Sequence, residues 1–192
     1  MNKIDKQVRE FIIPYYKETH RFYHNLDHIN DMLEVAYTHN IMLSQEQIFA
    51  IAFHDIVYLP WMTNGFNETQ SAQMVHQFNY MHGNNIGSSS MELIQQIIID
   101  TIDHRATIEE SKPVLDLDLH SLAIEPNLFN KHTENIRKEY CFVSAKKFRT
   151  GRIAFLKGLQ TRKYLFSTGY FRYVCEKYAQ DNIKRELKRL NA

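Results

Sequence analysis

The segment from residue 45 to 57 constrains the fold more than any other part of the chain, because it is apolar on nearly every side. Ser44 followed by Gln47 forms a capping-box pattern, which predicts that a helix begins there. The apolar residues of this segment are Ile48, Phe49, Ile51, Ala52, Phe53, Ile56 and Val57. A helix without a polar face belongs in the middle of a bundle. We therefore expect it to be the central helix of the domain.

The rest of the chain also has the spacing of helices rather than strands. With only 6 Gly and 4 Pro in 192 residues, turns and bulges are scarce. Apolar residues at helical spacing predict helices over 3–18, 21–36, 67–78 and 90–104, and several more from Pro126 to the end. Residues 115–123 alternate apolar and acidic side chains, which would also suit a short strand, but we favour a helix. The prediction is an all-α fold in a single domain over residues 1–192.

Composition narrows the classes of protein to consider. The residues after Met1 are charged, which predicts no signal peptide. No apolar run approaches the roughly 20 residues of a membrane span, so we expect no contact with a membrane. The two cysteines, Cys141 and Cys175, have no metal-binding spacing and are interpreted as reduced thiols. These features together predict a cytoplasmic protein.

Charge is distributed unevenly along the chain, although the net charge is only +1. Residues 131–192 hold 16 Lys and Arg against 5 Asp and Glu, a local net charge of +11. Residues 1–130 hold 7 against 17, a local net charge of −10. Two interpretations remain open: a basic wall that faces an acidic one within the fold, or a basic surface for a polyanion.

A histidine and an aspartate, His54 and Asp55, stand together near the end of the central helix. Charged groups are rarely buried unless they are paired or bound to a metal. An imidazole nitrogen and a carboxylate oxygen are suitable ligands for a divalent cation, although a hydrogen-bonded pair is the simpler alternative. His24 and His28 are four residues apart and would share one helix face if both were helical. The alternative for these two is a surface or capping role.

Further acidic and imidazole groups are candidates for the same site. Asp118 is our preferred inward-facing aspartate in the 115–123 segment, with Asp116 in reserve. Glu68 is a candidate acid or base near the metal, or simply a carboxylate that suits the start of a helix. His104 is a candidate metal ligand or phosphate contact, or a helix-ending imidazole.

The ordered set His28, His54-Asp55, Asp118 resembles the H…HD…D signature of the HD-domain superfamily of metal-dependent phosphohydrolases. The stretch YHNLDH at 23–28 is similar to a motif of cyclic nucleotide phosphodiesterases, which implies that His28 is a metal ligand and His24 a general acid. YHN-x-x-HI, FHD-x-x-Y, NE-x-x-SA, D-x-DL and IRKEY also resemble a subfamily of uncharacterised predicted phosphohydrolases. The resemblance implies an HD-domain-like helical bundle with a metal site, but no particular substrate.

These observations predict a metal-dependent phosphohydrolase that uses metal-activated water. The expected substrate is a nucleotide or small phosphorylated metabolite, cleaved as a phosphomonoester or phosphodiester. The cofactor is one or two divalent ions of Mn, Fe, Co, Ni, Zn or Mg. The predicted metal ligands are His28, His54, Asp55 and Asp118; the catalytic residues His24, Asp55 and Glu68; the substrate-binding residues His104, Arg137 and Arg152.

Two other functions stay open at the level of sequence. Some HD-type folds hold two irons and activate oxygen. The basic half could instead belong to a nucleotide-binding or nucleic-acid-binding module whose metal site is residual. Whether the chain forms a homo-oligomer is also left open.

Overall fold

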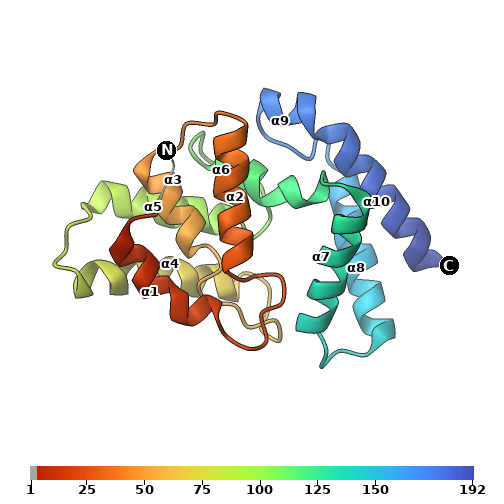
Figure 1. Cartoon of the computed structure of the whole chain (residues 1–192), viewed down its shortest axis with the longest axis horizontal. Coiled ribbons are helices and arrows are strands. Elements are labelled where there is room, and N and C mark those ends of the chain that lie inside the picture. Colours follow the sequence, from red (N-terminus) through yellow and green to blue (C-terminus); the bar gives the residue numbers. More distant parts are fainter. Residues whose placement is uncertain (1–3) are drawn as a thin grey trace.

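The computed structural model describes residues 4–192, and every regular element in that range is a helix (Figure 1). The predicted all-α fold is therefore confirmed. The elements are α1 (Lys6–Tyr16), α2 (Leu26–Thr38), α3 (Gln45–Phe53), α4 (Phe66–Met81), α5 (Ser88–Asp100), α6 (Ser111–Leu119), the 3₁₀-helix η1 (His120–Leu122), α7 (Pro126–Glu139), α8 (Ala145–Gln160), α9 (Gly169–Val174) and α10 (Glu176–Asn191).

Helix α3 is the central helix, as its sequence predicts. Ala50, Ile51, Ala52 and Phe53 have no exposed surface, and the helix contacts α1, α2, α4, α5 and α6. The capping box at Ser44 is present, with both of its hydrogen bonds. The helix ends four residues earlier than expected, at Phe53. This early end places the next residues in a turn at the helix terminus, where their side chains can converge on a site.

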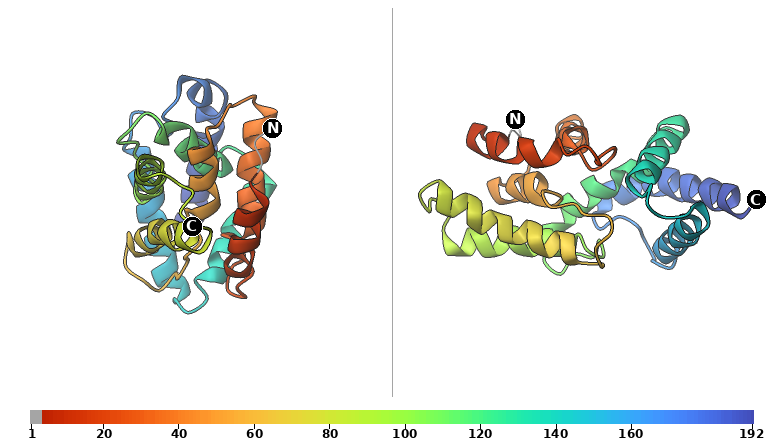
Figure 2. Two further views of the ribbon diagram at one scale, coloured as in Figure 1. Left: turned by 90° about the vertical axis from the view of Figure 1, so that its left-hand side faces the viewer. Right: turned by 90° about the horizontal axis from the view of Figure 1, so that it is seen from below.

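The helices form two groups, one at each end of an elongated molecule. Helices α1, α3, α4 and α5 lie at one end, and α7, α8 and α10 at the other (Figures 1 and 2). Helix α6 contacts α2, α3 and α5, whereas η1, which follows it directly, contacts α7 and α10. The α6–η1 segment therefore joins the two groups, and residues from both can meet around it.

Several predicted helix bounds need correction. The helix expected over 21–36 begins at Leu26, and the one expected over 90–104 ends at Asp100. The first of the helices expected from Pro126 onward is α7, which begins at Pro126 with Glu125 as its cap. Pro at the first helical position is favoured, since its missing N–H would have no partner there. Most of residues 115–123 are helical, so the prediction of a helix rather than a strand in this segment is confirmed.

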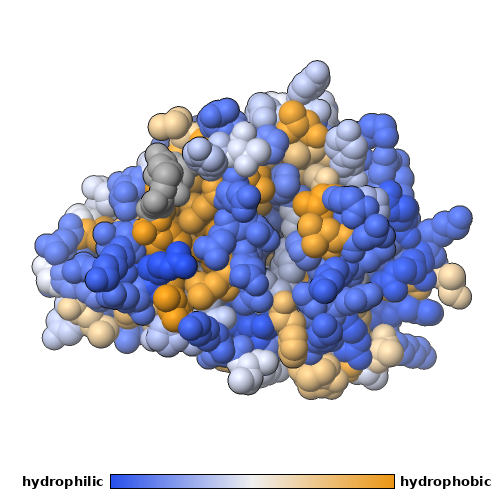
Figure 3. All heavy atoms as spheres, viewed as in Figure 1, coloured by the Kyte–Doolittle hydropathy of each residue, from blue (hydrophilic) through white to orange (hydrophobic). Residues whose placement is uncertain are grey.

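The exposed surface of the C-terminal group is rich in charge. In Figure 3 hydrophilic residues dominate the face over α7, α8 and α10. Exposed cations on α8 include Lys146, Lys147, Arg149 and Lys157. Within residues 4–192, none of the helices combines the length and the apolar character required to span a bilayer.

Candidate metal centre

His54 and Asp55 lie at the C-terminal end of α3, and both are buried. The His54 Nδ1 lies 2.9 Å from the carbonyl oxygen of Ile51, so that nitrogen carries the proton and donates. When the ring is neutral, its other nitrogen, Nε2, has a lone pair, as a metal-binding imidazole requires. It lies 3.1 Å from Asp55 Oδ2. The early end of α3 thus brings one nitrogen and one oxygen ligand to the same point.

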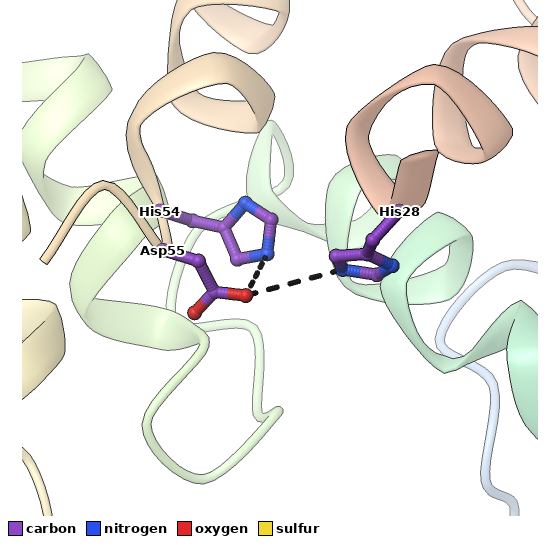
Figure 4. A group of neighbouring side chains, drawn as sticks. All are labelled: His28, His54 and Asp55. Atoms are coloured by element: carbon purple, nitrogen blue, oxygen red, sulfur yellow. Dashed lines mark ion pairs between the residues drawn. The ribbon is translucent and has the colours of Figure 1, made fainter. Parts of the chain in front are cut away.

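His28 reaches this point from α2. Asn25 caps that helix by accepting a hydrogen bond from the Asp27 N–H, which places His28 in the first turn. Its Nε2 lies 4.0 Å from Asp55 Oδ2, the same oxygen that His54 approaches (Figure 4). One ligand atom from each of His28, His54 and Asp55 lies within 4.8 Å of the others. This buried group could hold a metal ion.

Asp118, from α6, lies against the same group. Its Oδ1 is 3.2 Å from His28 Nε2 and 3.9 Å from His54 Nε2. Its Oδ2 accepts a hydrogen bond of 2.9 Å from His104 Nε2. Asp116, the reserve candidate, is elsewhere: it accepts hydrogen bonds from the backbone N–H groups of residues 167 and 168, ahead of α9. The structure therefore brings together all four predicted metal ligands, with Asp118 rather than Asp116.

The donor set fits a divalent cation. The Nε2 atoms of His28 and His54 are buried and have no hydrogen-bond partner of acceptable geometry in the described chain. Buried polar atoms normally have such a partner, so two unpaired nitrogens that face two carboxylates call for an ion between them. Burial alone would lower the pKa of His54, but without a metal the charge of Asp55 outweighs it and raises the pKa to about 10.

His104 stands in a turn beyond the end of α5, with a φ of +48°. Arg162, between α8 and α9, donates to the backbone carbonyls of Asp103 and His104, at 2.5 and 2.8 Å. This clamp holds the turn so that the imidazole meets Asp118. Because His104 contacts the carboxylate, the geometry suits a positioning role better than the substrate-binding role we assigned from sequence.

His24 lies beside the centre but outside α2, so the expectation that it shares a helix face with His28 is wrong. It occupies the turn before the Asn25 cap, and the two histidine ring centroids are 6.2 Å apart. Its Nδ1 is 2.7 Å from Glu139 Oε2, and its ring stacks on Tyr58 at 4.1 Å. Burial alone would lower the pKa of His24, but the bond to Glu139 raises it above its ordinary value.

Glu139, from α7, organises this whole turn. Its Oε1 accepts three backbone N–H bonds, from residues 22, 23 and 24, at 2.9, 2.7 and 2.9 Å. Its Oε2 also accepts a bond of 3.0 Å from the Tyr58 hydroxyl. Burial opposes ionisation, but the hydrogen bond and charge of His24, followed by the backbone bonds of residues 23 and 24, lower the pKa of Glu139, so it is a carboxylate at neutral pH. One side chain from the C-terminal group thereby fixes the position of His24.

Arg21 ties the same turn to the end of α3. Its guanidinium donates to the carbonyls of His24, Asp55 and Ile56, at 3.2, 2.5 and 2.9 Å. These carbonyls follow the last turn of α3 or precede α2, where intrahelical partners are lacking. Arg21 is buried and lies over the rings of Tyr16 and Tyr58. The backbone segments that carry His24 and Asp55 are thus held by one cation.

A cavity of about 600 Å³ opens onto the centre. His24, His54, Asp55 and Asp118 line one end, and residues of α7 and α8 line the other. Glu68 also lines it, and burial followed by the charge of Asp55 raises the pKa of its carboxyl group. The loop at 59–65 forms part of the cavity wall. Two hydrogen bonds between the Asn67 side chain and the backbone of Leu59 hold the start of this loop in place.

The two arginines predicted to bind substrate differ in their placement. Arg137 does not line the cavity; its guanidinium donates to the carbonyls of Tyr140 and Val143, at 2.6 and 2.9 Å, and stabilises the end of α7. Its assignment as a substrate-binding residue is therefore not supported by the geometry. Arg152 does line the cavity.

Sequence reasoning missed Glu139, Arg21 and Arg162 as residues that build the centre. Glu139 lies in the IRKEY stretch, so the resemblance gave a signal, but nothing in the sequence indicates what the carboxylate would bind. Arg21 and Arg162 act through contacts with backbone carbonyls, at sequence separations of 35 and 58 residues for Ile56 and His104. Such contacts carry no local pattern.

Comparisons with known proteins add no further constraint. No family model matches the chain, and neither the curated proteins nor the solved structures contain a significant match.

Proposed function

We propose that the chain is a metal-dependent phosphohydrolase of the HD type, acting on a nucleotide or a small phosphorylated metabolite. The observation that carries this proposal is the pair of buried, unpartnered Nε2 atoms of His28 and His54, which face Asp55 and Asp118 at one end of a cavity. A hydrogen-bonded structural cluster would leave no such nitrogen unpaired.

The four side chains that would hold the ion are His28, His54, Asp55 and Asp118. Their two nitrogens and two carboxylates suit Mn, Fe, Co, Ni, Zn or Mg, with positions left for water and substrate. A divalent ion bound there supplies Lewis acidity, which polarises a phosphoryl oxygen and makes a water molecule more acidic. His104 holds Asp118 in place through its hydrogen bond, as a partner of a metal ligand commonly does.

His24 supplies the proton for the departing oxygen in this proposal. Its Nδ1 is bonded to Glu139, so its Nε2 is the atom that donates into the cavity. The raised pKa of His24 keeps the ring protonated closer to neutral pH, as a general acid requires. The stacking on Tyr58 and the three backbone bonds to Glu139 orient the ring before any substrate binds.

The cavity is large enough for more than inorganic phosphate. Its volume of about 600 Å³ is in the range of pockets that enclose small organic ligands. Phe129, Tyr140 and Phe155 contribute apolar surface to its walls. These walls would contact the organic part of a phosphate ester while its phosphate faces the metal end.

The test is a screen of phosphorylated metabolites and nucleotides with several divalent metals, on wild type and Asp55→Ala. We expect Asp55→Ala to lose both metal binding and hydrolysis. Asp31→Ala, which removes an exposed carboxylate one turn after His28, should retain both. Full activity in Asp55→Ala would refute the proposal.

The same protein preparation separates the alternative functions. Two irons with a characteristic visible spectrum after anaerobic purification, without hydrolysis, would indicate an oxygenase. Strongly salt-dependent binding of DNA or RNA, again without hydrolysis, would indicate a nucleic-acid-binding module.

A further inference from the structure

The cavity contains a second polar cluster, away from the metal centre, on α7 and α8. Three buried side-chain atoms there have no hydrogen-bond partner in the described part of the chain: His132 Nδ1, Thr133 Oγ1 and Arg152 Nε. All three residues line the cavity. Buried polar atoms without partners are rare, and three in one wall indicate a site for a ligand.

Arg152 brings a positive charge that nothing in the described chain neutralises directly. It makes no ion pair with Asp55 or Asp118, and its guanidinium lies 5.5 Å from the centre of the Phe155 ring. Glu186 is a nearby carboxylate, but both of its oxygens are bonded to Arg189, at 2.7 and 2.8 Å. A largely buried cation without a counterion is costly, and an anionic ligand would remove that cost.

The neighbouring groups complete a binding site for an oxyanion. Thr133 is only 4% exposed, and its hydroxyl does not bond back to the preceding turn of α7, as it commonly would inside a helix. Burial lowers the pKa of His132, and the charge of His28 lowers it further, so its imidazole is neutral and able to donate one hydrogen bond. One guanidinium, one hydroxyl and one imidazole are the groups that phosphates and carboxylates accept bonds from.

The ring of Tyr23 lies next to one imidazole of this cluster and one imidazole of the metal centre. Its centroid lies 5.2 Å from that of His28 and 5.1 Å from that of His132. The two imidazoles are therefore neighbours of the same ring, one belonging to each cluster.

We propose that His132, Thr133 and Arg152 form a second subsite, which binds an oxyanion of the substrate other than the reacting phosphate. The substrate would then be a phosphate ester that carries a second phosphate or a carboxylate, such as a nucleoside bisphosphate. This inference rests on the proposed function for the reaction, but the binding step can be tested without it.

The binding test uses metal-free protein, treated with a chelator, and adenosine 3′,5′-bisphosphate in a calorimeter. We expect Arg152→Met to weaken binding by about tenfold or more, because a charge-assisted hydrogen bond is lost. Thr133→Val keeps the shape of the side chain and should weaken binding less. Arg149→Met removes an exposed charge from the same helix and should bind like wild type. Equal affinity in wild type and in both Arg152→Met and Thr133→Val would overturn the proposal, provided that circular dichroism shows all variants folded.

The kinetic test compares substrates that differ in one anionic group. Adenosine 3′,5′-bisphosphate is paired with adenosine 3′-monophosphate, and 3-phosphoglycerate with glycerol 3-phosphate, so that a second phosphate and a carboxylate are distinguished. We expect Arg152→Met to lower kcat/KM about tenfold or more for the doubly anionic member of the preferred pair and less than about twofold for the other. An equal loss for both members would mean that Arg152 holds the reacting phosphate, which overturns the second subsite.

The two tests also separate failure of the subsite from failure of the proposed function. If no substrate is hydrolysed with any metal, but the bisphosphate binds metal-free protein through Arg152, the phosphohydrolase proposal fails and the subsite stands. If hydrolysis is observed without a preference for doubly anionic substrates, the phosphohydrolase proposal stands and the second subsite fails.

Discussion

The bond between Glu139 and His24 predicts a stability change with a distinct pH profile. Glu139→Gln keeps the shape of the side chain, and the amide oxygen can still accept the three backbone bonds of residues 22–24. The amide nitrogen then faces His24 Nδ1 and the Tyr58 hydroxyl, so the charge-assisted bond to His24 is lost. Such a bond contributes about 2–3 kcal/mol to the free energy of unfolding.

The sign of the pH dependence follows from the two shifted pKa values. The pKa of His24 is raised, so its contribution is fully present below its ordinary value of 6.5 and is lost as pH rises through the folded pKa. The pKa of Glu139 is lowered, so its contribution is present above its ordinary value of 4.5 and is lost as pH falls through the folded pKa. The free energy of unfolding of wild type should therefore exceed that of the variant most between pH 4.5 and 6.5, and the difference should shrink as pH rises through the raised pKa of His24.

Urea unfolding of metal-free protein across this pH range measures the difference directly. Glu134→Gln is the matched control, because it makes the same change on an exposed side chain of α7 and should leave the free energy of unfolding unchanged within about 0.5 kcal/mol. A difference between wild type and Glu139→Gln that does not decrease at any pH above 6.5 at which the protein stays folded would refute the assignment of a charged pair.

Three more outcomes are expected. Metal binding must displace a proton from His54, whose pKa is about 10, so the apparent metal affinity should rise by about tenfold per pH unit between pH 6 and 8, with proton release detectable by calorimetry in buffers of different ionisation enthalpy. Asp116→Asn should lower the free energy of unfolding by about 1–3 kcal/mol and leave metal affinity unchanged, because its carboxylate holds the backbone ahead of α9. Asp118→Asn should weaken metal affinity and leave the stability of the fold unchanged. Thermal unfolding and metal titration distinguish the two variants. Arg162→Met releases the turn of His104 and should weaken metal affinity about tenfold, measured by competition with a chelator.

The helical architecture was accessible from the sequence because its signals are local. The capping box at Ser44 and the all-round apolar character of α3 depend on residues within a few positions of one another, and the structure confirms both. The convergence of His28, His54, Asp55 and Asp118 was reached through their order along the chain and the resemblance of that order to a known signature.

The remaining parts of the site depend on distant contacts that leave no local pattern. Glu139 is more than one hundred residues from the turn it organises. Spacing suggested that His24 lies within a helix, but the cap at Asn25 begins α2 after it. Arg137 and Arg152 look alike in sequence, both within a basic stretch. Only the fold distinguishes Arg137, which stabilises the end of a helix, from Arg152, which lines the cavity.

The uneven charge along the chain becomes an uneven charge in space at the junction between the two groups of helices. The carboxylates of the centre, Asp55 and Asp118, come from the acidic first part of the chain, whereas Arg152, which lines the same cavity, comes from the basic last part. A ligand in this chamber experiences an electric gradient from one end to the other. Such a gradient favours ligands whose charge distribution matches it, and it orients each of them before any bond to the protein forms.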